Sequence, residues 1–137
     1  YMLALAEHGI AVKQEYCVEM DFVPKDQTTE LVNLLSSKDR PTALLVSDDI
    51  FAMALEKTAY ELNLKIPEDL SIISFNNSLF AKLTSPQLTS IDINSRQLGI
   101  EAASQIINHI ENPELLATKI IVPHFMVERK SCSSYKG

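Results

Sequence analysis

The spacing of apolar positions changes along this chain, and each change marks a predicted element. The short, largely apolar run at 42–46 is typical of a strand covered on both faces, the run at 70–75 predicts a second buried strand, and the run at 88–93 predicts a third strand. Between the first two runs, Phe51, Leu55 and Leu62 recur at helical spacing. A strand, a helix and a strand within roughly 35 residues predict a parallel βαβ unit with a right-handed crossover.

The rest of the chain carries mixed patterns that extend this picture. The other predicted elements are strands at 14–20, 119–122 and 125–127, helices from Thr28 or Thr29 to 35, at 78–83 and from Asn94 or Ser95 to 112, and a loose polar tail at 131–137. The first residues look like the end of a helix that stops at Gly9, which predicts that the chain begins within an element of a longer protein. Together these elements predict an α/β fold with an open, doubly wound, mostly parallel sheet.

Composition narrows the class of protein. The chain has 137 residues, 46% of them apolar and 22% charged, which is typical of one globular domain. The net charge of −6 and the lack of a basic stripe argue against strong nucleic-acid binding by this chain itself. No apolar run approaches the roughly 18 residues needed to span a bilayer. Cys17 and Cys132 lie far apart, and we expect both to be reduced thiols in the cytoplasm.

Sequence patterns of enzyme sites are missing. The three glycines, Gly9, Gly99 and Gly137, are too scattered for a phosphate-binding loop. The three histidines have no metal-ligand spacing, and no serine or cysteine sits in a nucleophile-elbow pattern. We therefore expect no enzyme activity, no metal and no cofactor.

Polar side chains follow both strands of the βαβ unit, where ligands bind in open α/β sheets. Asp48 and Asp49 come after the first strand, and Asn76 after the second. Each carboxylate can cap the next helix, contact a ligand hydroxyl, or do both. The Asn76 amide can donate to and accept from vicinal hydroxyls, although asparagine is also a common turn residue.

Two aromatic residues flank these polar positions. Phe75 precedes Asn76 and is either a core residue or a wall of the pocket. Phe22 follows the predicted 14–20 strand and could stack on the apolar face of a sugar ring, or pack into the core.

One long stretch and several shorter motifs resemble the LacI/GalR family of bacterial transcriptional regulators. The matching segments, in order, are Arg-Pro-Thr-Ala from Arg40, Ser-Asp-Asp-Ile from Ser47, Leu-Asn-Leu-Lys-Ile-Pro-Glu-Asp-Leu-Ser-Ile-Ile-Ser-Phe-Asn-Asn from Leu62, Thr-Ser-Pro-Gln-Leu-Thr-Ser-Ile from Thr84, Leu98-Gly99 and Val-Glu-Arg-Lys-Ser from Val127. The resemblance covers essentially the whole chain in the right order. The Ser-Phe-Asn-Asn-Ser variant is similar to maltose-operon repressors of that family.

The resemblance implies a flavodoxin-like subdomain of the periplasmic-binding-protein-like type I fold. It assigns 1–90 to the C-terminal subdomain of an effector-binding domain. It assigns 91–117 to a crossover and a helix of the first subdomain, and 118–137 to returning strands and the tail. The family's DNA-binding helix-turn-helix domain is absent from this chain, so operator DNA would be bound only through that missing N-terminal domain.

The resemblance also implies roles for individual residues. Asp48 falls where the family often has a ligand-contacting asparagine, Asn76 where an aspartate usually binds sugar hydroxyls, and Phe22 near a stacking aromatic. With Asp49 and Phe75, these are the predicted ligand-binding residues. The implied protein is a cytoplasmic, homodimeric repressor that senses a sugar, with maltose or a related α-glucoside as the candidate. The alternatives are a transporter's sugar-binding protein of the same fold, and an enzyme of doubly wound fold.

Overall fold

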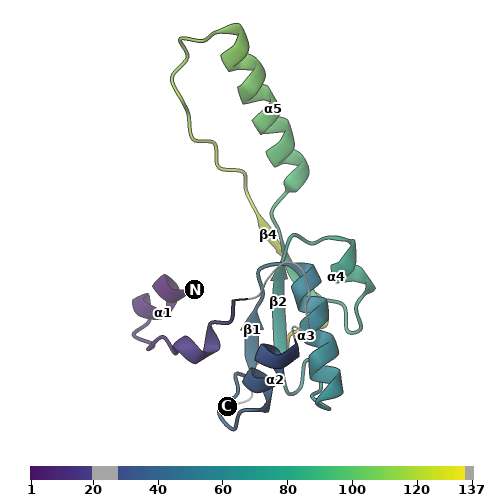
Figure 1. The fold of residues 1–137 in the computed structure, drawn as a ribbon. Coiled ribbons are helices and arrows are strands. Elements are labelled where there is room, and N and C mark those ends of the chain that lie inside the picture. The colour runs from purple at the N-terminus through teal and green to yellow at the C-terminus, as the bar shows by residue number, and fades with distance from the viewer. Residues whose placement is uncertain (20–27, 135–137) are drawn as a thin grey trace.

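A four-stranded sheet organises the chain (Figure 1). The computed structural model describes residues 1–19 and 28–134. The strands are β1 (Ala43–Leu45), β2 (Ser71–Phe75), β3 (Thr89–Asp92) and β4 (Phe125–Val127), in the spatial order β1-β2-β3-β4. The first three run parallel, and β4 pairs antiparallel with β3. The mixed, open sheet therefore has its β1, β2 and β3 carboxyl ends along one edge.

Six helices accompany the strands in the described residues. They are α1 (Met2–Glu7), the 3-10 helix η1 (Gln14–Tyr16), α2 (Thr28–Ser36), α3 (Asp49–Glu61), α4 (Leu79–Leu83) and α5 (Ser95–Glu111). Of these, α2, α3 and α4 pack against the sheet. The βαβ prediction is confirmed, because α3 joins the parallel strands β1 and β2. After α1, Gly9 adopts φ 66, a left-handed conformation that suits glycine just beyond a helix end.

The core lies between the sheet and the helices α2, α3 and α4. Its fully or nearly fully buried members are small and medium-sized apolar side chains, namely Leu31, Leu35, Ala52, Leu55, Ala59, Leu70, Ile72, Ala81 and Leu88. Along β2, Ile72 and Ser74 are buried whereas Ile73 and Phe75 are only half-buried. The expectation of coverage on both faces is therefore wrong for β1, where Ala43 and Leu45 are exposed, and the expectation of a buried strand holds for only one face of β2. The other face borders an open hollow that Leu45, Ile73 and Cys132 line.

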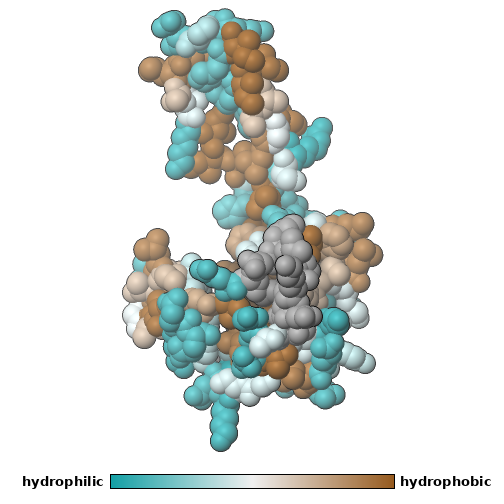
Figure 2. Space-filling model, viewed as in Figure 1, coloured by the Kyte–Doolittle hydropathy of each residue, from teal (hydrophilic) through white to brown (hydrophobic). Residues whose placement is uncertain are grey.

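The crossover between β3 and β4 carries α5 away from the sheet (Figure 1). Helix α5 has no buried residue, and its apolar side chains Ile106 and Ile110 are 61% and 72% exposed. Residues 112–124 return to the sheet with their apolar side chains mostly exposed as well. Figure 2 shows brown apolar patches on this part, mixed with teal polar side chains.

Three sequence predictions fail at the margins of the sheet. The predicted strand at 14–20 is wrong for its described residues, because 14–16 form η1 and 17–19 are not in a strand. The Tyr16 hydroxyl donates a hydrogen bond to the Asp39 carbonyl, which ties η1 to the loop before β1. Residues 119–122 form no strand, because strand residues need a partner and the crossover lies apart from the sheet. The tail is not loose at its start. Ser131 is fully buried.

Nothing in 1–19 or 28–134 is a helix with the length and hydropathy required to traverse a bilayer.

Candidate functional site

Asp48 and Asn76 meet beyond the carboxyl ends of β1 and β2. The Asn76 amide Nδ2 donates to Asp48 Oδ2 at 2.5 Å. Asp48 Oδ1 accepts from the backbone N–H of Ile50 at 2.7 Å, which makes Asp48 the N-cap of α3. Both side chains are half-buried. A carboxylate and an amide are thus held together at the edge where parallel sheets bind ligands.

The backbone around Asn76 explains why asparagine suits this position. Asn76 has φ 91 and Asn77 has φ 46. Residues other than glycine and asparagine rarely adopt such positive φ angles. The Asn76 N–H still donates to the Ile91 carbonyl at 2.9 Å, which continues the pairing of β2 with β3. The reversal of the chain after β2 therefore places the Asn76 side chain over the end of β1.

Asp49 faces the opposite way, into the protein. It is fully buried, and its Oδ1 accepts from the hydroxyls of Ser74 at 2.5 Å and Ser90 at 2.8 Å. Its Oδ2 accepts from the Ser78 N–H at 2.6 Å. These contacts bind the start of α3 to the ends of β2 and β3, and leave Asp49 no surface to offer a ligand. We therefore assign Asp49 a structural role.

Of the two aromatic candidates for the ligand site, the structure describes only Phe75. Phe75 is the last residue of β2 and is half-buried, next to Asn76. Phe22 lies outside the described residues.

A second polar group, which sequence reasoning missed, adjoins the first. The Asn77 Nδ2 donates to Asp92 Oδ2 at 2.9 Å, and the Asn77 Oδ1 accepts from Arg129 Nη2. Asp92 Oδ1 also accepts from the Asn94 N–H at 2.7 Å. The hydrogen bonds from Asn77 and Asn94, with the positive charge of Lys82, hold the pKa of Asp92 below its usual value. No local pattern signals this group, since Asn77 and Arg129 lie 52 residues apart.

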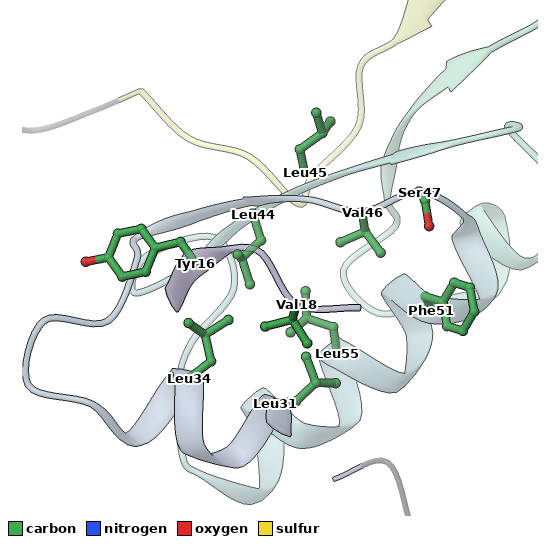
Figure 3. A pocket seen from close by; sticks show the side chains of 10 residues that line it. All are labelled: Tyr16, Val18, Leu31, Leu34, Leu44, Leu45, Val46, Ser47, Phe51 and Leu55. Atoms are coloured by element: carbon green, nitrogen blue, oxygen red, sulfur yellow. The ribbon is translucent and has the colours of Figure 1, made fainter. Parts of the chain in front are cut away.

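A separate hollow of about 200 Å³ lies between α2, β1 and α3. Figure 3 shows the aliphatic side chains of Leu31, Leu44 and Leu55 facing it, with Ser47 and Phe51 at one end. Most of the side chains that line it are apolar, and among these side chains only Tyr16 and Ser47 carry hydroxyls that could bond a polyol. The polar residues Asp48 and Asn76 are therefore the better candidate site.

Comparison with known proteins decides the family. The family model described as the periplasmic binding protein-like domain matches residues 1–132. The chain belongs to this family. The HTH-type transcriptional repressor PurR of Edwardsiella ictaluri is 36% identical to the chain over 131 residues. The matched residues make up 96% of this chain and 38% of that protein. The chain thus spans under half the length of the curated relatives it matches.

Solved structures of the family agree. A LacI transcriptional regulator from Bacillus cereus subsp. cytotoxis superimposes with a TM-score of 0.87 at 31% identity, covering 98% of this chain and 48% of that one. A sugar-binding transcriptional regulator of the LacI family from Escherichia coli, solved with phosphate, gives 0.80 at 26% identity, covering 96% and 47%. The α/β fold class and the resemblance to LacI/GalR regulators are therefore confirmed. So is the expectation that the chain is not an enzyme, since these relatives are regulators.

Proposed function

We propose that this chain is the C-terminal part of the effector-binding domain of a transcriptional repressor that works in the cytoplasm as a homodimer. The effector is a sugar, with maltose or a related α-glucoside as the candidate. The observation that carries this proposal is the Asp48–Asn76 pair at the carboxyl edge of β1 and β2. Support for a sugar comes from the Escherichia coli relative, which is described as sugar-binding.

The chemistry of the pair suits a polyol. Each Asp48 oxygen already accepts one hydrogen bond and retains a lone pair for a hydroxyl donor. The Asn76 amide keeps its Oδ1 as an acceptor and its second N–H as a donor. Because the two groups fix each other, little side-chain entropy is lost when a ligand binds. We assign Phe75 to an apolar wall of the site, and the resemblance implies a stacking role for Phe22.

The apolar surface of α5 supports the proposed division of the chain. We assign 1–90 to the C-terminal subdomain, 91–117 to the crossover and a helix of the first subdomain, and 118–137 to returning strands and the tail. Ile106, Ile107 and Ile110 are exposed, and an apolar stripe on a helix normally packs against a partner. In a longer protein that partner is the rest of the first subdomain.

This arrangement gives a mechanism for sensing. An effector that contacts both subdomains favours the closed arrangement in proportion to its differential affinity for the two states. DNA would be bound by an N-terminal helix-turn-helix domain, as the description of PurR as an HTH-type repressor suggests. Closure would change the distance between the two DNA-binding domains of the dimer.

Calorimetry of the full-length protein with a panel of sugars tests the proposal. Asp48→Ser removes the carboxylate and keeps an N-cap side chain, and Asn76→Gly removes the amide and tolerates positive φ. We expect saturable heat with one sugar class, and binding weakened roughly tenfold or more in each variant. Asn63→Gly is the matched control, because Asn63 also has positive φ, at 57, beyond the end of α3.

Each result is decisive for one part of the proposal. Absence of heat with every sugar would refute the sugar effector and direct the search to nucleobases, phosphorylated metabolites or a partner protein. Full binding by both variants would refute the assigned site. The alternative, a transporter's sugar-binding protein, would be indicated by sugar binding in a full-length protein without a DNA-binding domain.

A further inference from the structure

The two strands of the crossover are tied together by one side chain next to the candidate site. Asn77 bonds Asp92 at the end of β3 with its amide N–H, and accepts from Arg129, two residues after β4, with its amide oxygen. Asn77 thereby joins Asp92, where the chain leaves β3, to Arg129, which lies past the end of β4 and beside the start of β3. Asn77 also directly follows Asn76, the proposed ligand contact.

Further contacts fix each end of this connection. Arg129 donates from Nη1 to the Leu88 carbonyl at 2.6 Å, which holds its side chain across the start of β3. Asp92 accepts from the N–H of Asn94, whose φ of 54 sets the direction in which α5 begins. The Asn77 N–H donates to Ser90 Oγ at 2.9 Å, and Ser90 in turn bonds the buried Asp49. The bonds of Asp92 lie at the end of β3, where the chain continues into α5, and those of Arg129 lie at the start of β3.

We propose that Asn77, with Asp92 and Arg129, is a latch that sets the direction of the α5 crossover and couples it to the loop holding Asn76. This inference rests on the proposed function for the identity of the site, and adds the residues that relate the site to the crossover. Asn77 is a positioning residue: it contacts the strands of the crossover, and its neighbour contacts the ligand. The latch restricts the crossover to the orientation that is competent for binding.

The geometry favours a latch over an ordinary turn. A turn after β2 needs only the positive φ of Asn76 and Asn77, which glycine would satisfy. The Asn77 amide instead uses its donor on Asp92, the last residue of β3, and its acceptor on Arg129, two residues beyond β4. A carboxylate on one side and a guanidinium on the other strengthen these hydrogen bonds relative to neutral pairs.

A charge exchange tests the latch in the full-length protein. Asn77→Asp keeps the shape and the tolerance of positive φ, retains an acceptor for Arg129, and places a second carboxylate against Asp92. The double variant Asn77→Asp with Asp92→Asn restores a donor and an acceptor across the same gap. Asp92→Ala removes the two bonds that Asp92 accepts and leaves Asn77 unchanged. Asn76→Gly is the control that lacks the ligand contact and keeps the latch.

The readout is the distance between spin labels, measured by pulsed electron paramagnetic resonance without ligand. Labels go at Lys57→Cys on α3 and Ser104→Cys on α5, both exposed positions, with native cysteines changed to serine. We expect the distance distribution to widen roughly twofold in Asn77→Asp and Asp92→Ala, and to return to its original width in the double variant. It should stay unchanged in Asn76→Gly.

Effector affinity supplies the second readout. With fewer molecules in the competent orientation, Asn77→Asp should bind effector roughly three- to tenfold more weakly, and the double variant should recover. An unchanged distance distribution in Asn77→Asp and Asp92→Ala, or a double variant no better than the single one, overturns the latch. If no sugar binds, the proposed effector fails while the distance measurement still decides the latch.

Discussion

Asp49→Ala should be among the most destabilising substitutions in this protein. The carboxylate is fully buried and accepts three hydrogen bonds, from Ser74, Ser78 and Ser90. A buried donor left without a partner costs about 1–3 kcal/mol, and of the three donors the hydroxyls of Ser74 and Ser90 are buried whereas the Ser78 N–H is half-buried, so about 3–9 kcal/mol is an upper range for the loss. The lower half applies here, because the Ser74 hydroxyl can turn toward the Thr89 carbonyl, 3.5 Å away. We expect a loss of about 3–5 kcal/mol, a large part of the stability of a typical domain.

Urea unfolding followed by circular dichroism at neutral pH measures this loss as a lower midpoint at an unchanged denaturant slope. The neighbouring Asp48→Ala is the control. It removes a half-buried N-cap and should cost only about 1 kcal/mol. A loss below about 1 kcal/mol in Asp49→Ala would refute the structural role, because it would mean that the buried hydroxyls of Ser74 and Ser90 need no acceptor. A stable Asp49→Asn variant that fails to bind effector would instead return Asp49 to the ligand site.

Three further substitutions test other buried or charged groups by urea unfolding. Burial raises the pKa of Glu56 from 4.5 to about 7, and Glu56 Oε1 has no hydrogen-bond partner in the part of the chain that the structure describes. The free energy of unfolding should therefore fall as pH rises from 4.5 to about 7, because the folded state favours the protonated carboxyl. Glu56→Gln should remove that dependence and gain about 1 kcal/mol at alkaline pH, after allowance for its half-exposed position; equal pH profiles would contradict this. The lowered pKa of Asp92 means that its contribution to stability is present above pH 3.8 and lost as pH falls through the lowered pKa, so Asp92→Asn should flatten the profile below pH 3.8. Ser131 Oγ donates to the Ile72 carbonyl at 2.6 Å and accepts from the Thr89 N–H at 2.8 Å, so Ser131→Ala should cost about 2 kcal/mol, and a neutral result would show that water replaces the hydroxyl.

The sequence was a good guide wherever local periodicity matched the final environment. The βαβ unit, the short helix after Ser78 and the long helix after Asn94 were predicted within a few residues of their observed bounds. Their signals are apolar spacing and capping residues, which act over a few positions along the chain. The position of Asp48 and Asn76 beyond adjacent strands was likewise predictable, because parallel connection through one helix brings the carboxyl ends of both strands to one edge.

Predictions failed where a strand needed a partner that the pattern alone cannot supply. Residues 14–19 and 119–122 alternate or run apolar as strands do, yet neither pairs with the sheet. Strand propensity reflects packing on a pleated surface and has little force without a neighbour. The polar composition of the tail likewise concealed Ser131, whose burial depends on β2 and β3.

What the sequence determined by itself is the class of fold, the order of its elements and the residue types at the ends of the strands, because these depend on local spacing. Only the tertiary structure decided which of two adjacent aspartates faces outward. Successive residues at a helix start point in different directions, so Asp48 meets Asn76 whereas Asp49 is buried among serines. The tertiary structure alone also brought Asn77, Asp92 and Arg129 together, since contacts between residues far apart in the chain exist only after the strands have paired.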